Sequence, residues 1–462
     1  MADPKKTIAL RWGEFAENTT FKDLSPELVR KSKEFILDII GCILGAKHVP
    51  GSQIIAKTLL AQGGTQDSTV FNYTAKLPAP NAAFINAAAG HAFDMDDDHR
   101  RGTLHCSVVV FPAVLAMAER YGASGKEVIT AYALGSELMI RLGAAFLGQT
   151  YYQGFHPTGT VGGGGAAIGA GKIIGLPAKK LEMAQSLAQG MAAGLLEWKA
   201  QGSWSKRTNA GHAAMTGVLS AQLAREGYIA PTTIYEGDDG FIRAYSYKDQ
   251  YDLNVITDRL GSYWELEYNS IKPHACCRFS CPIVDAGLDV RRKYSPKIED
   301  IEDVLVKCQK YTMKVLTVPR ELKYNPKTEV DLQFNLPYAA AVALAKGQAM
   351  TTEFTEEAAQ DPVVHALMQK VRGEEDPELE KVYPEKYPIR IIVTMKNGQK
   401  YESYIDYPVG DPENPIPHAD LIAKFEYLTS VHKDKAKIKA IIDICEKLED
   451  LNDINELARL LA

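Results

Sequence analysis

Apolar residues recur at helical spacing through the first half of the chain. Ile36, Ile40 and Ile43 repeat on one stripe behind Ser25, a typical N-cap residue, and this run ends near Gly45. The pattern predicts an amphipathic helix that buries one face against the rest of the protein.

Other predicted helices are rich in alanine and glycine. One begins at the capping-box pair Ser124 and Glu127, and two more cover residues 175–198 and 209–227. Small residues lie on several faces of these helices, which lets neighbouring helices approach closely on all sides. We therefore expect them at the centre of a helical core.

The pattern changes after about residue 268. Residues 302–318 and 387–410 are β-rich, and Asn397-Gly398 in the second segment is a hairpin-turn signal. Residues 330–347 look helical, and residues 434–462 return to helix.

These elements predict a mainly α protein with three segments. Residues 1–268 form a large helical domain, residues 269–410 an inserted α+β domain, and residues 411–462 C-terminal helices that rejoin the helical domain. We find no repeat period of the kind that marks a solenoid.

Composition narrows the class of protein. The chain is 46% hydrophobic and 24% charged, as globular proteins are, and its net charge of −6 argues against nucleic acid or an anionic membrane as partner. No uninterrupted apolar run reaches the ~18 residues of a membrane span, and charge interrupts the N-terminus too early for a signal peptide. Seven cysteines spread over the chain do not indicate a disulfide framework. We therefore expect a reduced, cytoplasmic protein.

Two motifs resemble cofactor-binding sites, but neither has all the residues that such a site requires. Residues 159–175 are glycine-rich, yet Ala166 stands where a phosphate loop needs glycine and Ile173 where it needs serine or threonine. A glycine-rich, tightly packed helix start is the better interpretation. Three cysteines cluster in residues 276–281, but an adjacent pair is awkward for ligating an Fe–S cluster.

The acidic stretch FDMDDDHRRGTLHCS also raises the question of a metal. Asp94, Asp96 and Asp98 alternate as at the start of a calcium loop, but His99 replaces the turn glycine and His105 the twelfth-position glutamate. No cysteine pair accompanies the histidines, as a zinc site would require. We expect no metal, and acid–base chemistry is the hypothesis that remains.

Several loop–helix junctions carry polar side chains beside small or apolar residues. A helix N-terminus offers unpaired N–H groups that suit an anionic substrate, and histidine exchanges protons near neutral pH. The residues at these junctions are His105, His156, Lys206, Arg207, Lys272, His274 and Arg278.

Each of these residues also has an ordinary structural explanation. A histidine before a helix is often a cap, Lys206 and Arg207 alone indicate a solvated turn, and Tyr338 alone indicates a core tyrosine. Four such junctions in one chain favour a site, although spacing alone does not show that they converge.

Six segments together identify a family resemblance that covers nearly the whole chain. The chain resembles the MmgE/PrpD family, and the segments are NAAAGHAFDMDDDH, HCSVVVFPAVLAMAE, GFHPTGTVG, SKRTNAGHAAMTG, SIKPHACCRFSCPIVDA and DLQFNLPYAAAVAL. The resemblance implies a large all-helical domain with a smaller α+β lid domain, usually in a homodimer. It also implies an enzyme that needs neither a metal nor an organic cofactor.

The resemblance also implies roles for individual residues. The catalytic set it implies is His105, His156, Lys206, Lys272, Tyr338 and Asp94. From the residues themselves we add Asp98, Arg207, Arg278 and His274 as substrate-binding candidates. Several departures from the family bear on the substrate: Asp98 lies where the decarboxylase of the family has threonine, and Cys106 follows the loop histidine where proline is usual. The acidic loop is also one residue longer than in the decarboxylase, and a different segment after Lys272 brings Arg278 toward the pocket.

We expect a lyase that dehydrates a hydroxylated di- or tricarboxylate similar to 2-methylcitrate. Alternatives within the resemblance are an epimerase of an iminodisuccinate-like dicarboxylate and a cis-aconitate-type decarboxylase. A catalytically silent polycarboxylate-binding protein is less favoured, because the histidines and lysines are all present. The sequence does not decide which histidine is the acid and which the base.

Overall fold

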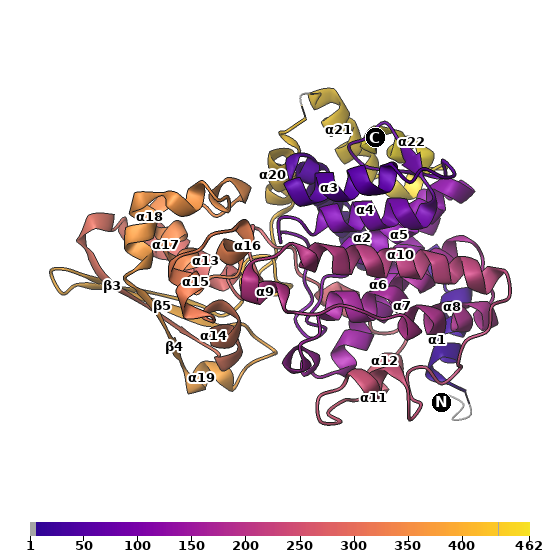
Figure 1. Ribbon diagram of the computed structural model, residues 1–462, viewed down its shortest axis with the longest axis horizontal. Coiled ribbons are helices and arrows are strands. Elements are labelled where there is room, and N and C mark those ends of the chain that lie inside the picture. Colours follow the sequence, from indigo (N-terminus) through magenta and orange to yellow (C-terminus); the bar gives the residue numbers. More distant parts are fainter. Residues whose placement is uncertain (1–5, 433) are drawn as a thin grey trace.

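A computed structural model describes residues 6–432 and 434–462, and within them a helical domain lies beside a smaller α+β domain (Figure 1). The mainly α fold class is confirmed. The helices of the helical domain are α1 (Ile8–Asn18), α2 (Pro26–Gly45), α3 (Pro50–Leu60), α4 (Ala79–Gly90), α5 (Ser107–Tyr121), α6 (Gly125–Ala145), α7 (Pro157–Ile173), α8 (Ala178–Gly190), α9 (Trp198–Gln201), α10 (Ser205–Arg225), α11 (Phe241–Tyr245) and α12 (Asn254–Thr257). A short antiparallel pair, β1 (Ser68–Thr69) and β2 (Lys76–Leu77), lies between α3 and α4.

Helix starts follow the predicted capping signals. The Ser25 side chain accepts a hydrogen bond from the Leu28 N–H at the start of α2, and Ser124 and Glu127 form a reciprocal capping box at the start of α6. Such caps satisfy N–H groups that have no partner inside the helix. They fix where each helix begins, and therefore which residues its apolar stripe buries.

The glycine-rich segment is a central helix, as expected. It forms α7, which packs against α5, α6, α8 and α10. A Cβ atom at Gly165 would lie only 2.5 Å from the carbonyl oxygen of Gly135 on α6, so only glycine allows this approach. The glycines of α7 therefore serve close helix packing.

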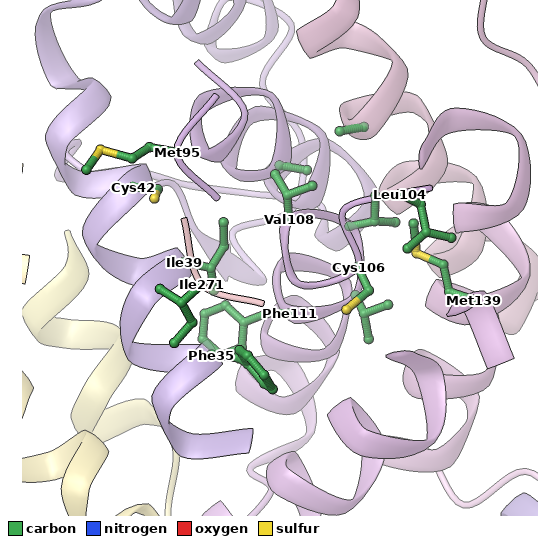
Figure 2. Close-up of a cluster of buried hydrophobic side chains, with 14 of the residues drawn as sticks. Phe35, Ile39, Cys42, Met95, Leu104, Cys106, Val108, Phe111, Met139 and Ile271 are labelled. Atoms are coloured by element: carbon green, nitrogen blue, oxygen red, sulfur yellow. The ribbon is translucent and has the colours of Figure 1, made fainter. Parts of the chain in front are cut away.

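The core of the helical domain is assembled from several helices (Figure 2). Phe35 and Ile39 of α2 lie near Val108 and Phe111 of α5, with Met139 of α6 in the same apolar cluster. By length and composition α6 is apolar enough to cross a membrane, but its most apolar window is entirely buried inside the protein. In the described part of the chain α6 is therefore a core helix.

The second domain, which we call the lid domain, contains a mixed sheet of strand order β4-β3-β5-β6. Its strands are β3 (Ile301–Cys308), β4 (Val371–Glu375), β5 (Ile389–Met395) and β6 (Lys400–Ile405). Its helices are α13 (Cys281–Tyr294), α14 (Lys310–Leu316), α15 (Arg320–Tyr324), α16 (Glu329–Gln333), α17 (Leu336–Lys346), α18 (Pro362–Met368) and α19 (Pro377–Glu380). β3 runs parallel to β4 and antiparallel to β5, and β5 and β6 form the hairpin predicted from Asn397-Gly398.

One β prediction is wrong. Residues 302–318 were expected to be β-rich throughout, but the strand ends at Cys308 and helix α14 follows. The buried residues of α14 are Tyr311, Thr312, Val315 and Leu316. Two adjacent pairs four residues apart share one face of a helix, whereas in a strand the two members of each pair would point to opposite faces of the sheet.

The C-terminal helices lie on the helical domain (Figure 1). They are α20 (His418–Thr429), α21 (Lys435–Glu446) and α22 (Asn455–Leu461), and both α20 and α21 pack against α2. Lys424 of α20 is buried and forms an ion pair with Asp38 of α2 at 2.5 Å, and it donates a hydrogen bond to the carbonyl of Met95. Helix α20 thus contacts the acidic loop through the hydrogen bond to Met95.

Candidate active site

A small cavity lies where the helical domain meets the lid domain. Its volume is about 20 Å³, and charged side chains from both domains face it. Its lining residues are Asp94, Asp98, Thr103, His105, Tyr151 and Lys206 from the helical domain and Cys277, Arg278, Phe279, Phe334 and Tyr387 from the lid domain.

A larger hollow of about 800 Å³ lies on the lid domain near Asp289, Arg292 and Asn414. It contains none of the residues expected to be catalytic, whereas the small cavity collects three of them, Asp94, His105 and Lys206. We therefore take the small cavity as the candidate active site.

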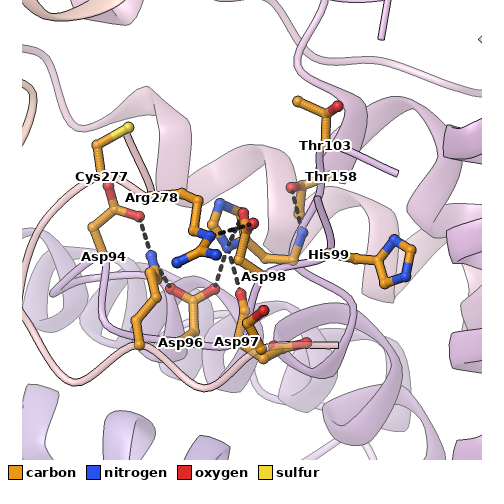
Figure 3. A network of polar contacts seen from close by, with 12 residues as sticks. Asp94, Asp96, Asp97, Asp98, His99, Thr103, Thr158, Cys277 and Arg278 are labelled. Atoms are coloured by element: carbon orange, nitrogen blue, oxygen red, sulfur yellow. Dashed lines mark hydrogen bonds and ion pairs between the residues drawn. The ribbon is translucent and has the colours of Figure 1, made fainter. Parts of the chain in front are cut away.

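The acidic loop follows directly after α4 and gathers its carboxylates in one network (Figure 3). Asp94 adopts a left-handed backbone conformation with φ of 52°. A non-glycine residue in this conformation carries strain, and such strain persists where the surrounding structure holds it. The conformation directs Asp94 toward two lysines from distant parts of the chain.

Lys206 and Lys272 both bind Asp94. Their Nζ atoms lie 2.6 Å and 2.9 Å from Asp94 Oδ1, and Lys272 Nζ is also 3.9 Å from Asp96 Oδ1. Burial alone would raise the pKa of Asp94, but the two ammonium groups outweigh burial and hold the pKa well below its ordinary value. Asp94 is therefore an anion between two cations.

The same loop places three groups that are able to bind a metal close together. Ligand atoms of His91, Asp94 and Asp96 all lie within 4.8 Å of one another. However, the two lysines hold Asp94, and His91 Nδ1 lies 2.8 Å from Asp96 Oδ2. The ammonium groups thus already balance these carboxylates, and a metal ion would have to displace them.

His105 faces the cavity from the residue before the N-cap of α5. Its Nδ1 lies 2.6 Å from the carbonyl oxygen of Asp97, and its backbone N–H donates to Thr158 Oγ1. The Asp97 carboxylate accepts hydrogen bonds from the backbone N–H groups of Cys106 and Ser107 at the start of α5. Burial lowers the pKa of His105, so its ring is neutral near pH 7.

His156 lies beside the cavity but does not line it. It is the N-cap residue of α7 and is fully buried, with its ring centroid 5.7 Å from that of His91 and 5.9 Å from that of Trp198. Its Nδ1 lies 3.2 Å from Nδ2 of Asn209 on α10. Burial lowers the pKa of this histidine as well.

Arg278 and Asp98 meet across the two domains. Arg278 Nε lies 3.5 Å from Asp98 Oδ2, and Arg278 Nη2 donates to Asp411, which also accepts from Ser270 Oγ. Burial raises the pKa of Asp98 to about 7, although the guanidinium of Arg278 opposes this effect. Nε and Nη1 of Arg278 are buried without a hydrogen-bond partner among the described residues.

Three predicted site residues lie elsewhere. The Tyr338 hydroxyl donates to the carbonyl of Glu353, and His274 Nε2 lies 2.9 Å from Asp285 of α13. Arg207 points away from Lys206, its neighbour on α10, and pairs with Glu329 of α16. None of the three side chains lines the cavity, so their positions do not support the predicted direct contacts with substrate.

Other site residues were not predicted. Phe334 lies four residues before Tyr338, at the C-terminal end of α16, and lines the cavity, while Tyr151 and Tyr387 add aromatic walls from opposite domains. His91 stands at the start of the acidic loop, five residues before Asp96. His91 lies in the same sequence motif as Asp94, so the motif could have indicated it as a site residue. No local sequence pattern indicates that the aromatic residues line the site.

Sequence comparison supports the family resemblance directly. The family model of the MmgE/PrpD N-terminal domain matches residues 11–254, and that of the MmgE/PrpD C-terminal domain matches residues 274–450. This chain belongs to the MmgE/PrpD family. The C-terminal family model continues past residue 410 into α20 and α21.

Curated relatives of this MmgE/PrpD protein are similar over almost their full length. The cis-aconitate decarboxylase of Aspergillus terreus is 27% identical over 97% of this chain and 94% of its own. The cis-aconitate decarboxylase of Homo sapiens is 27% identical over 95% of this chain and 91% of its own, and that of Mus musculus is 26% identical over 95% and 90%.

Proposed function

We propose that this protein is a lyase that dehydrates a hydroxylated di- or tricarboxylate without a metal or organic cofactor. The observation that carries the proposal is one small cavity faced by a neutral histidine, His105, and by two cations, Lys206 and Arg278. A base and cationic groups around one space are what proton removal next to a carboxylate requires.

The chemistry begins with a proton on a carbon adjacent to a carboxylate. Removing that proton places negative charge on the carboxylate as an enediolate, which is costly in water. Cations held in place in a buried site stabilise this charge without reorganising during the reaction. A second group then protonates the departing hydroxyl group, which leaves as water and generates the alkene.

Arg278 supplies the substrate-binding cation in this proposal. Lys206 and Lys272 are both engaged by Asp94, whereas Arg278 keeps two buried nitrogens, Nε and Nη1, without a hydrogen-bond partner among the described residues. A buried donor without a partner costs roughly 1–3 kcal/mol, which a bound carboxylate would recover. Asp98, with its pKa near 7, lies beside Arg278 and is placed to hydrogen-bond a substrate hydroxyl group.

Decarboxylation is the second candidate, because the curated relatives are named cis-aconitate decarboxylases. Decarboxylation leaves the same carbanion-like charge and needs a proton donor rather than a base. Epimerisation of a dicarboxylate is a third candidate, in which the proton is removed from one face of the carbon and returned to the other.

One experiment separates these reactions. The protein is dialysed against EDTA and then incubated in D₂O with 2-methylcitrate, citrate, cis-aconitate or iminodisuccinate while ¹H NMR spectra are recorded. Loss of the hydroxylated substrate with formation of an alkene supports dehydration: a new vinyl signal for citrate, and for 2-methylcitrate either a vinyl signal or a methyl singlet at the chemical shift of a methyl group on an alkene, according to which carbon loses its proton. Replacement of the cis-aconitate vinyl signal by the signals of an alkene with one carboxylate fewer supports decarboxylation, and deuterium incorporation without a new alkene supports epimerisation. No change in any substrate contradicts the proposal.

A further inference from the structure

The hydrogen bonds of the two histidines differ in direction. His105 Nδ1 lies 2.6 Å from the carbonyl oxygen of Asp97, and a carbonyl oxygen only accepts hydrogen bonds. Nδ1 of His105 must therefore carry the ring proton. In a neutral imidazole this leaves the lone pair on Nε2, which is the basic form.

His156 shows the reverse arrangement. Its Nδ1 lies 3.2 Å from Nδ2 of Asn209, and an amide nitrogen only donates. Nδ1 of His156 must therefore accept, so the ring proton sits on Nε2. That Nε2 is buried and has no hydrogen-bond partner among the described residues, so no described protein group holds its proton.

The orientation of the Asn209 amide is fixed by its surroundings. Nδ2 also lies 3.4 Å from the carbonyl oxygen of Leu195, so a flipped amide would bring two oxygens together. The backbone N–H of His156 donates to the carbonyl of Gly194, next to Leu195. The same short segment, Gly194 and Leu195, therefore contacts both His156 and the Asn209 amide. A Cβ atom at Gly159 would lie 3.0 Å from Asn209 Cβ, so the base of this half-buried side chain packs against α7.

We propose that Asn209 is a positioning residue that holds His156 in the Nε2–H tautomer, so that His156 is the acid and His105 the base of the pair. This inference rests on the proposed function and adds the order of the two histidines to it. Asn209 acts only through His156 and does not line the cavity. The opposite tautomers allow one neutral ring to take a proton while the other gives one.

The first test measures the tautomers directly. Nitrogen-15 NMR of the full-length protein labelled at histidine, without substrate, distinguishes Nδ1–H from Nε2–H rings. We expect Nδ1–H for His105 and Nε2–H for His156, and a mixture of tautomers for His156 in N209L. An Nδ1–H ring for His156 in the wild type, or an unchanged Nε2–H ring in N209L, would overturn the proposal.

The second test measures turnover of the accepted substrate. N209L should lower kcat roughly 10- to 100-fold and leave KM within about twofold, because only proton transfer is affected. T208A is the matched control, since among the described residues the Thr208 hydroxyl bonds only the carbonyl of Ser205 on the same helix. Equal kcat for N209L and T208A would overturn the positioning role.

A third variant tests the tautomer through the pH dependence of kcat. In N209D a carboxylate accepts from Nδ1, which forces the neutral ring of His156 into the Nδ1–H form and raises its pKa. N209D should therefore lose kcat as the pH rises through the pKa of His156, because only the protonated ring still carries a proton on Nε2. A pH profile that matches the wild type would contradict the proposal. Predicted tautomers with no turnover of any carboxylate would instead refute the proposed function alone.

Discussion

At the scale of residues, the site depends on carboxylates that the fold buries in different charge environments. Asp94 lies between two ammonium groups and stays ionised, whereas Asp98 is buried beside a single guanidinium and has a pKa of about 7. Two aspartates four positions apart thus differ in protonation at neutral pH, because their neighbours differ.

This difference predicts how stability depends on pH. Between about pH 4 and pH 7 the folded protein keeps a proton on Asp98 that the unfolded chain has lost, so this residue makes stability fall as pH rises through that window. D98N lacks this proton. The free energy of unfolding of D98N minus that of the wild type, measured in urea, should therefore rise from pH 4 to pH 7 and stay constant above pH 7.

The control for this prediction is D420N, at an exposed aspartate in the first turn of α20. It should show no such trend. A D98N difference that is independent of pH, or that falls with increasing pH, would contradict the burial effect proposed for Asp98.

At the scale of elements, α7 positions His156 because its glycines allow neighbouring helices to approach. Gly165 lies against the backbone of α6, while Gly163 in the same helix has only ordinary contacts, the nearest to an added Cβ being 3.4 Å away. The two glycines therefore have different packing roles despite their shared sequence context.

Alanine substitutions test this distinction. G165A should lower the free energy of unfolding by about 1–3 kcal/mol, because its methyl group would collide with the Gly135 carbonyl. G163A should be neutral or raise stability by up to about 1 kcal/mol, because alanine favours helix over glycine. Urea denaturation of both variants checks this, and equal effects would show that the close approach does not matter.

The same scale shows how far the sequence could predict the molecule. Caps, the Asn397-Gly398 hairpin and the β-rich character of the lid domain were predicted from local signals, and so was the placement of His105 before a helix. Lys206 was expected ahead of a helix but lies in the first turn of α10, which begins at Ser205. Which face of a helix meets the site depends on packing with distant segments. For this reason Phe334, rather than Tyr338, lines the cavity, and Arg207 turns toward Glu329.

At the scale of the whole molecule, the two domains close over the site. The cavity of about 20 Å³ holds no more than about one water molecule, so a polycarboxylate needs the domains to separate before it binds. The ion pair of Arg207 with Glu329 and the contact of Tyr151 with Tyr311 join the helical and lid domains. Both contacts would break if the two domains separated.

This arrangement predicts a distance change that spectroscopy can measure. All seven native cysteines are buried, so spin labels at I54C in the helical domain and V363C in the lid domain would react selectively. Without ligand we expect a broad distribution of label distances, which narrows to the shorter end with a saturating tricarboxylate. One narrow distribution that is identical with and without ligand would contradict domain opening.

The central claim is that a metal-free cavity carries out acid–base chemistry through His105, and the turnover of H105Q tests it most directly. With the substrate identified by NMR and after EDTA dialysis, H105Q should lose at least about 10²-fold in kcat, because it lacks the base. H212Q, at a half-buried histidine of α10 outside the site, should keep wild-type kcat. A kcat for H105Q within about fivefold of the wild type would contradict the account.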